Sequence, residues 1–315
     1  MTYATIKTLM AGTAILALSA CGLMADRPQG QGASEMQTVT PDTPVRYDFV
    51  RNATARLHYG GKIFLLDPML SDKGALPSFA GVAPNPTVAL PIDADRVIAG
   101  IDGVIVGHMH ADHFDATAAA LLPKDTPLLV PANSAPVDPG DLSSDQDFKA
   151  RLEGLGFTQV TEIGDGVLWQ GVGFDQVWGR HGHGDVAAHM GGVNGIILRA
   201  EGQPTVYWTG DTVLDAEGRV LDIVDRYEPD IVIAHTGGPV VPALSDEILL
   251  MDAEEAAQLF RYALSVNPDV SLIAVHMDSL DHSFSTRADL MAVLSRQGLS
   301  GRVSVPQDGE TVTFR

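Results

Sequence analysis

The residues with the clearest capacity for chemistry lie together in the segment 108–113, which reads HMHADH. Its imidazoles and carboxylate form a donor set that suits zinc, manganese or iron. In an extended loop, the side chains of His108 and His110 point to the same side, so that both can bind one ion. Asp112 and His113 follow the bend and can face a second ion. The segment therefore predicts half of a site for two metal ions.

The elements around this segment place it at the end of a strand. Residues 101–107 (IDGVIVG) are a short apolar run that predicts a buried strand, and residues 115–122 have helical composition. Proteins that alternate strands and helices commonly place their functional sites at the carboxyl ends of strands. We therefore expect the remaining ligands at the ends of other strands.

Two such residues follow predicted strands farther along the chain. Asp211 lies near the end of the segment 206–212 (VYWTGDT), where a carboxylate can bridge two ions. His276 follows the apolar run 272–275 and can reach the same edge of a sheet. Both residues are candidates for the distant half of the site.

The third histidine for the first ion is ambiguous in the sequence. The loop 179–184 reads GRHGHG and contains His181 and His183, and His189 lies close by. One of these three imidazoles is expected to join His108.

Other elements can be assigned from apolar patterns and turn residues. Residues 54–59 and 62–67 flank a Gly-Gly pair, which predicts a β-hairpin. Residues 253–264 and 286–296 are amphipathic, and Asp252 and Ser285 are the candidate N-caps for these helices. Two strand-rich halves with outer helices suggest two sheets packed between helix layers.

The motifs resemble those of the metallo-β-lactamase superfamily. The pattern His-x-His-x-Asp-His at 108–113 is the superfamily's signature, and Thr-Gly-Asp at 209–211 and His276 follow in the expected order. The resemblance covers about residues 45–315. It implies an α/β fold of the αββα sandwich type, with two mixed β-sheets between outer helix layers, for a domain at 44–315.

Within the superfamily, the closest resemblance is to the ascorbate-6-phosphate lactonase-like branch. The features that carry it are Asp67-Pro68, AVHMD at 274–278 and PQDGET at 306–311. This branch places its third first-site histidine directly after the segment 177–180, which favours His181. The resemblance thus implies two divalent ions, with these ligands: His108, His110 and His181 for the first; Asp112, His113 and His276 for the second; Asp211 shared.

The same resemblance implies a hydrolase in which two ions, most readily Zn²⁺ with Mn²⁺ or Fe²⁺ as alternatives, activate a bridging hydroxide. Asp112, Asp211 and His235 are the catalytic candidates, and Asp211 also keeps the ions together. His235 and His282 are candidates for contacts with the substrate or behind the ligands. Asp67 is expected to orient a ligand histidine through a hydrogen bond.

The expected substrate is a small ester or lactone. One alternative is a phosphodiesterase like the N-acyl phosphatidylethanolamine phospholipase D enzymes, although few lysines or arginines lie near the motifs and Arg180 is the main candidate for binding a phosphate. Another is a non-catalytic, metal-binding envelope lipoprotein. The single cysteine, Cys21, precedes the domain, which excludes the cysteine-liganded second site of the antibiotic-hydrolysing β-lactamases.

The N-terminus predicts export and lipidation. Residues 1–20 have the charged start and apolar run of a secretory signal, and LSAC at 18–21 resembles the bacterial lipobox, with Cys21 as the lipidated residue. Residues 21–43 are rich in Gly, Gln, Pro, Ser and Thr and predict a flexible tether. Gly22 in place of Asp favours the outer membrane if the host is Gram-negative, so the chain is expected at the cell envelope.

The charge of the chain excludes one class of partner. The net charge is −20 and the isoelectric point is about 4.6, so the phosphate backbone of a nucleic acid would be repelled. The expected partners are a small-molecule substrate and, through the lipid anchor, a membrane.

Overall fold

The computed structural model describes residues 43–133, 147–164 and 166–314. The predicted signal segment 1–20, Cys21 and nearly all of the tether lie outside the described residues. Within the described residues, no helix combines the length and the apolar character needed to cross a membrane. The first strand begins at Val45.

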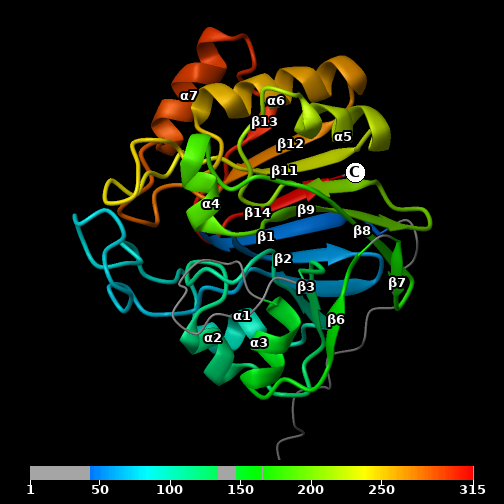
Figure 1. The fold of residues 1–315 in the computed structure, drawn as a ribbon. Coiled ribbons are helices and arrows are strands. Elements are labelled where there is room, and N and C mark those ends of the chain that lie inside the picture. The colour runs from blue at the N-terminus through cyan, green and yellow to red at the C-terminus, as the bar shows by residue number, and fades with distance from the viewer. Residues whose placement is uncertain (1–42, 134–146, 165, 315) are drawn as a thin grey trace, which may run out of the picture. The chain divides into compact units, whose positions relative to one another are not determined.

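The first sheet is mixed and has seven strands in the order β14-β1-β2-β3-β4-β5-β6 (Figure 1). Its β14 to β3 half is antiparallel, and its β3 to β6 half is parallel. The strands are β1 (Val45–Arg51), β2 (Thr54–Tyr59), β3 (Lys62–Leu66), β4 (Gly103–Ile105), β5 (Leu128–Val130), β6 (Val160–Glu162) and β14 (Thr311–Phe314).

The second sheet is also mixed, in the order β13-β12-β11-β10-β9-β8-β7. Strands β10 to β13 are parallel, whereas β7 to β10 are antiparallel. The strands are β7 (Val167–Trp169), β8 (Val172–Trp178), β9 (Asn194–Ala200), β10 (Val206–Trp208), β11 (Ile231–His235), β12 (Ser271–Val275) and β13 (Val303–Ser304).

Helices cover the outer face of each sheet, which gives the four layers of an αββα sandwich (Figure 1). The predicted fold is therefore confirmed. The helices on the first sheet are α1 (Ala94–Ile98), α2 (Ala116–Leu121) and α3 (Phe148–Gly154), those on the second are α5 (Arg219–Tyr227), α6 (Ala253–Val266) and α7 (Arg287–Arg296), and the short η1 (Gly184–Val186) and α4 (Ala187–Met190) lie in the β8–β9 connection.

The alternation of side chains along each strand explains this layering. On β3, Phe64 and Leu66 face the second sheet, whereas Leu65 points outward beneath the helices. The Phe64 ring meets Phe174 of β8 edge-on, with the ring centroids 5.7 Å apart. Burial of one such side chain stabilises the fold by about 1.5–3 kcal/mol. Both faces of β3 are thus buried, as is usual where helices cover a parallel sheet.

One of the two predicted helix caps is correct and the other is wrong by one residue. The Asp252 carboxylate accepts hydrogen bonds from two backbone N–H groups of the first turn of α6, as expected. At α7, Thr286 rather than Ser285 is the cap. The Thr286 hydroxyl accepts from the backbone N–H of Asp289, and the Asp289 carboxylate accepts from the backbone N–H of Thr286, which together form a capping box. The Ser285 hydroxyl instead accepts from the backbone N–H of Ala253.

Candidate metal centre

Imidazoles and carboxylates from both sheets gather at the carboxyl ends of the strands. The first sheet contributes the residues after β3 and β4, and the second contributes those at the ends of β8, β10, β11 and β12. The gathered residues are Asp67, His108, His110, Asp112, His113, His181, Asp211, His235 and His276.

His108, His110 and His181 form a first group. The Nδ1 atom of His110 lies 3.0 Å from Nε2 of His108 and 3.2 Å from Nε2 of His181. The Nδ1–H group of His181 donates to the carbonyl of Leu249 at 2.8 Å, so its Nε2 atom carries a lone pair in the neutral ring. Three ring nitrogens thus converge, and a cation between them would satisfy their lone pairs.

Asp112, His113 and His276 form a second group. The Nε2 atoms of His113 and His276 lie 3.1 Å apart, and Oδ2 of Asp112 is 3.4 Å from each of them. The other ring nitrogen of His113, Nδ1, lies 2.6 Å from Oδ2 of Asp67. Oδ1 of Asp67 accepts from the backbone N–H of Gly107. The hydrogen bond expected from Asp67 to a site histidine is therefore present, and it turns Nε2 of His113 toward the centre of the group.

Asp211 lies between the two groups. Its Oδ2 atom is 3.1 Å from Nε2 of His113 and 3.5 Å from Nε2 of His276. The same oxygen is 3.8 Å from Nε2 of His181 and 3.9 Å from Nε2 of His108. A single carboxylate oxygen within 4 Å of histidines of both groups has the position that a shared ligand requires.

The turn before Asp211 requires glycine. Gly210 has φ +61°, and a Cβ atom there would lie 2.6 Å from the carbonyl oxygen of Asn194. A larger residue would therefore push the turn away from β9 and move the Asp211 carboxylate.

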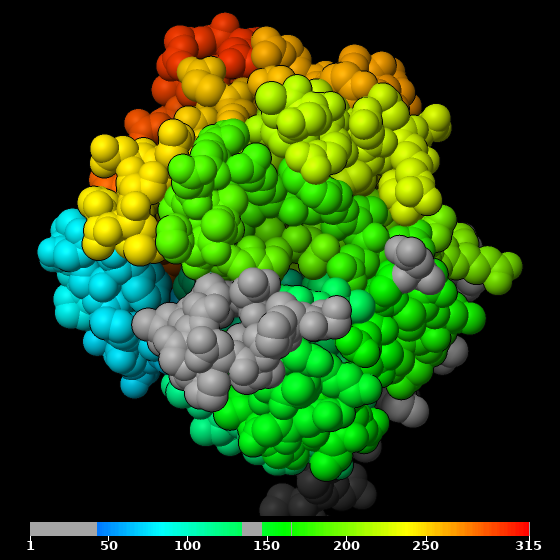
Figure 2. Space-filling view, in the orientation of Figure 1, coloured from blue at the N-terminus to red at the C-terminus, as the bar shows by residue number. Residues whose placement is uncertain are grey.

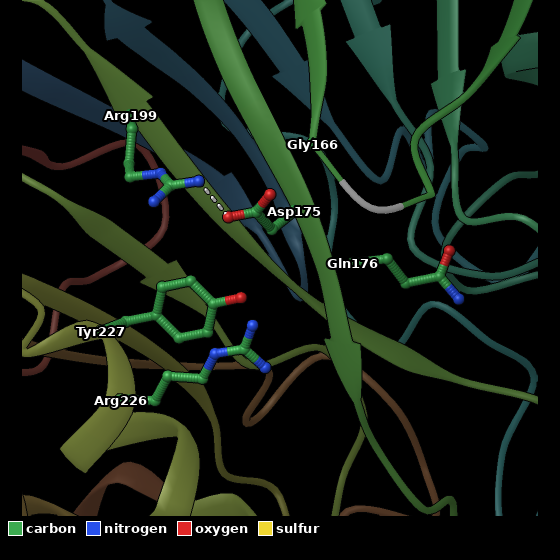
Figure 3. Close-up of a pocket in the computed structure, with 6 residues that line it drawn as sticks. All are labelled: Gly166, Asp175, Gln176, Arg199, Arg226 and Tyr227. Atoms are coloured by element: carbon green, nitrogen blue, oxygen red, sulfur yellow. Dashed lines mark hydrogen bonds and ion pairs between the residues drawn. The ribbon is translucent and has the colours of Figure 1, made fainter.

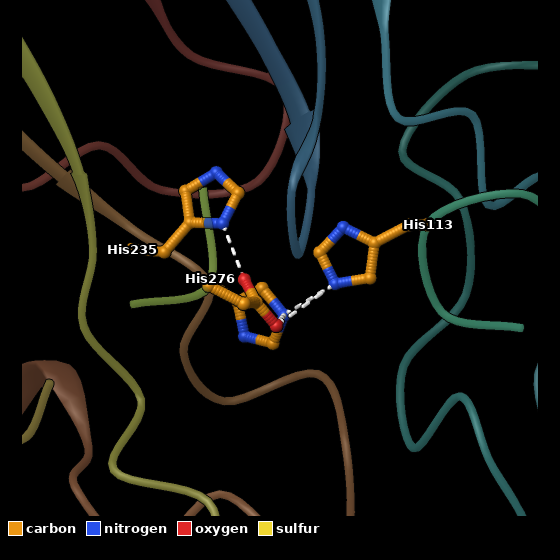
Figure 4. A group of neighbouring side chains, drawn as sticks. His113, His235 and His276 are labelled. Atoms are coloured by element: carbon orange, nitrogen blue, oxygen red, sulfur yellow. Dashed lines mark hydrogen bonds and ion pairs between the residues drawn. The ribbon is translucent and has the colours of Figure 1, made fainter. Parts of the chain in front are cut away.

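His235 lies behind Asp211 and not in the open part of the site. Its Nδ1 atom is 2.6 Å from Oδ1 of Asp211, and the indole N–H of Trp208 donates to its Nε2 atom at 2.8 Å. Both ring nitrogens are thus engaged, and the neutral ring carries its proton on Nδ1. In Figure 4, dashed lines join His235 to one oxygen of this carboxylate and His113 to the other.

The protonation states of the buried groups fit a cation site. Burial lowers the pKa of His108 well below its usual range and that of His110 to about 3, so both rings are neutral and able to ligate. Burial would raise the pKa of Asp112 and Asp211, but the neighbouring imidazoles hold both carboxyls well below their usual range. Burial also opposes charge on His113, yet the three carboxylates of Asp211, Asp112 and Asp67 raise its pKa. Two dications would balance this concentration of buried negative charge.

The geometry separates the three candidates for the third histidine of the first group. His181 lies with His108 and His110, whereas Nε2 of His183 is 2.6 Å from Oε1 of Glu255 on α6. His189 is exposed on α4. Of the three, only His181 faces the other two imidazoles of the group.

Sequence reasoning missed Asn52, which supports the second group from the turn between β1 and β2. Its side-chain amide donates to the backbone carbonyl of Asp112 at 3.1 Å, and its backbone carbonyl accepts from the backbone N–H of His276 at 2.9 Å. Asn52 and His276 have φ of +57° and +68°, in the left-handed region that is uncommon for residues other than glycine. The signal was an asparagine in a hairpin turn, which tolerates this conformation.

A surface hollow of about 440 Å³ lies away from the metal centre, between β8, β9 and α5 (Figure 3). Arg199 pairs with Asp175 inside it, so part of its charge is already neutralised. Arg226 lies over the ring of Tyr227, 5.1 Å from the centroid. The hollow holds none of the predicted site residues, and we assign the chemistry to the imidazole groups.

The comparisons with known proteins agree on one family. The model of the Beta-lactamase superfamily domain matches residues 63–277. The UPF0173 protein YddR of Bacillus subtilis is 31% identical over 271 residues, which are 84% of this chain and 98% of the relative. A UPF0173 metal-dependent hydrolase of Azorhizobium caulinodans is 25% identical over 85% of this chain and 99% of the relative.

Two solved structures are similar over nearly their whole length. One is a possible metal-dependent hydrolase from Veillonella parvula, with a TM-score of 0.75 and 29% identity over 86% of this chain and 100% of that one. The other is the isothiocyanate hydrolase from Delia radicum gut bacteria, with a TM-score of 0.72 and 30% identity over 85% of this chain and 99% of that one.

Proposed function

Since the chain belongs to the metallo-β-lactamase superfamily and, within it, to the UPF0173 metal-dependent hydrolases, we propose that it is a two-metal hydrolase acting on a small electrophilic carbon compound. The observation that carries this proposal is the position of Asp211, whose Oδ2 atom lies within 4 Å of histidines in both imidazole groups. A one-ion site would not need a buried carboxylate between two separate sets of nitrogen donors.

The ligand assignment follows the two groups. Three imidazoles and one carboxylate form the donor set that tetrahedral zinc prefers, and this supports Zn²⁺ ahead of Mn²⁺ or Fe²⁺. In this proposal the ligands are His108, His110 and His181 for the first ion, Asp112, His113 and His276 for the second, and Asp211 for both.

Two divalent ions held there would supply a hydroxide nucleophile near neutral pH and would stabilise the charge that develops on the atom under attack. The protein's part is to fix the donors. Trp208 and His235 hold the Asp211 carboxylate in one orientation, and Asp67 does the same for the His113 ring. We therefore assign His235 as a positioning residue for Asp211 and keep Asp112 and Asp211 as the groups that face the reaction.

The proposed substrate is a small ester or lactone, with an isothiocyanate as the second candidate. In an ester, water adds to the carbonyl carbon and the carbon–oxygen bond breaks to give an acid and an alcohol. In an isothiocyanate, one water adds to the central carbon and the products are an amine and carbonyl sulfide. The second candidate is favoured by the similarity to an isothiocyanate hydrolase at 30% identity.

The phosphodiesterase alternative has less support. Arg180, the main candidate for a phosphate contact, donates from Nη2 to the carbonyl of Gly184 in its own loop. Its backbone N–H donates to the hydroxyl of Thr212. The guanidinium is therefore already engaged in holding the loop that carries His181, which favours an uncharged substrate.

The experiment is turnover by the zinc-loaded full chain of four substrates: a γ-lactone, an aryl ester, an aryl isothiocyanate and a bis-aryl phosphodiester. We expect turnover of the lactone, the ester or the isothiocyanate that a chelator abolishes and zinc restores. The matched control is Asp102→Ala, which removes a surface carboxylate that accepts from the backbone N–H of Ile63 on β3. Turnover of the phosphodiester alone would contradict the substrate proposal, as would silence on all four with two ions bound.

We also propose that the chain is anchored at the cell envelope through lipid on Cys21. The support is the lipobox-like sequence at 18–21 and the apolar run before it. Mass spectrometry of the N-terminal peptide from the native host tests this proposal. A peptide beginning at an acylated Cys21 is expected, and an unmodified chain beginning at Met1 would contradict it.

A further inference from the structure

Three loops meet beside the metal centre. The backbone N–H of Val240 donates to the carbonyl of His282, and that of Ser285 donates to the carbonyl of Gly237, so the segments 237–240 and 282–285 run together. The segment 78–85 joins them through Asp281. Figure 2 shows the surfaces around residues 237–240 (yellow) and 78–85 (cyan) close to each other on one side of the molecule.

The carboxylate of Asp281 organises the segment 78–85. It accepts hydrogen bonds from backbone N–H groups and side chains along this segment, and these donors lower its pKa against the effect of burial. In the part of the chain that the structure describes, no lysine or arginine pairs with it. The donors are the hydroxyl of Ser78, the backbone N–H groups of Phe79, Ala80, Val82 and Ala83, and Nδ2 of Asn85.

The neighbouring residue, His282, connects this loop to the metal centre. Its ring meets Phe79 edge-on, with the centroids 5.1 Å apart. The His282 residue is 6% exposed, and its Nδ1 atom is buried with no hydrogen-bond partner among the described residues. The His282 loop adjoins the second imidazole group, since a Cβ atom at Gly237 would clash with the carbonyl oxygen of His276 and lie 3.3 Å from the hydroxyl of Ser283. Burial lowers the pKa of His282 to about 4.

The same loops expose apolar side chains. Val82, in the segment that Asp281 holds, is 76% exposed, and Phe284, two residues after His282, is 58% exposed. Phe79 is half-buried, with its ring against that of His282. An aromatic ring and a neutral imidazole with an unpaired nitrogen form a wall that suits a substrate with an aryl group next to a polar atom.

We propose that Asp281 is a positioning residue that holds the segment 78–85 so that Phe79 and His282 form the substrate-binding wall. Phe79 contacts an aryl substituent, and His282 forms a hydrogen bond with a polar atom beside it. This inference deepens the proposed function and rests on it, because it assigns an aryl-substituted substrate class to the same site.

The test measures ligand binding to the zinc-loaded full chain by calorimetry, with phenylacetate as a product analogue and acetate as its counterpart without the ring. The variants are D281N, F79A and their combination, and the matched control is D102N, which alters a carboxylate that also accepts a backbone N–H. Each of D281N and F79A is expected to weaken the binding of phenylacetate about tenfold and that of acetate less than twofold, because only the aryl contact is lost. The double variant is expected to be no weaker than F79A, and D102N to match the wild type.

Equal weakening of both ligands, or additive losses in the double variant, would overturn the inference, since Asp281 would then act through general stability. If D281N does not fold, S78A takes its place with the same direction of effect, because it removes one donor to Asp281 and keeps the carboxylate. Binding needs no turnover, so the two proposals fail separately. If the wild type prefers phenylacetate but turns over none of the four substrates, only the proposed hydrolase function is contradicted. If it is active but lacks this preference, only the proposed substrate-binding wall is contradicted.

Discussion

The two imidazole groups are built differently. The first group has three histidines, and one of them, His181, comes from a glycine-rich loop and is oriented by a single backbone carbonyl, that of Leu249. The second group contains a carboxylate, that of Asp112, and its His113 ring is fixed by the buried carboxylate of Asp67. The first group therefore relies on neutral donors, one of them on a separate loop, and the second relies on buried charge.

This difference predicts unequal affinities. Burial opposes charge on His113, yet the carboxylates of Asp211, Asp112 and Asp67 raise its pKa, which means that negative charge is concentrated around the second group. A dication placed there gains more electrostatic energy than one placed among three neutral imidazoles. We therefore expect the ion of the second group to be held more tightly.

The largest expected effect comes from Asp211→Ala, because this change removes the carboxylate that lies between both groups. Turnover of the best substrate is expected to fall by on the order of 10³-fold, and bound zinc to fall below two ions per chain. The measurements are initial rates and metal analysis on the same samples. Two retained ions with rates within tenfold of the wild type would mean that Asp211 is not a shared ligand.

A smaller effect, confined to the second group, is expected from Asp67→Ala. Removal of the carboxylate that orients His113 is expected to lower the affinity for the second ion about 10- to 100-fold and to leave the affinity for the first ion unchanged. Competition with a chromophoric zinc chelator resolves the two affinities. Asp67→Asn, which keeps an oxygen acceptor for the Gly107 N–H, is the matched control. Its affinity for the second ion is expected to lie between those of the wild type and Asp67→Ala. An equal loss at both ions would contradict the separation of the groups.

The smallest effect is expected from His183→Gln, which removes the contact between the His181 loop and Glu255. Both partners are partly exposed, so the contact is worth up to about 1 kcal/mol and its loss should weaken the first ion up to about fivefold. The comparison variant His181→Ala is expected to lose that ion. If His183→Gln lost the first ion and His181→Ala kept it, the assignment of these two histidines would be reversed.

Much of the fold could be predicted because it depends on local patterns. The hairpin at 54–59 and 62–67 matches β2 and β3 to within one residue, since Gly60-Gly61 and alternating burial act over short distances. Strands β6 to β8 were not predicted, because they are short or carry partly exposed side chains. The amphipathic α5 was also missed, and its N-cap, Gly218, provides no side-chain cap that would mark where the helix begins.

The site divides in the same way. The residues at strand ends could be proposed from their types and from the order of the motifs. The contacts that hold them could not, because they join distant segments. Trp208 reaches His235 only because β10 and β11 are neighbours in the sheet. Asp281 reaches Ser78 across 203 positions, and no local pattern marks that contact.

Metal stoichiometry tests most directly whether two ions share Asp211. Mass spectrometric metal analysis of the full chain after zinc loading and desalting should give two ions per chain for the wild type. His181→Ala and His276→Ala should each retain one, and Asp211→Ala should retain fewer than two. A wild type that binds a single ion, or one that keeps two ions in Asp211→Ala, would contradict the account.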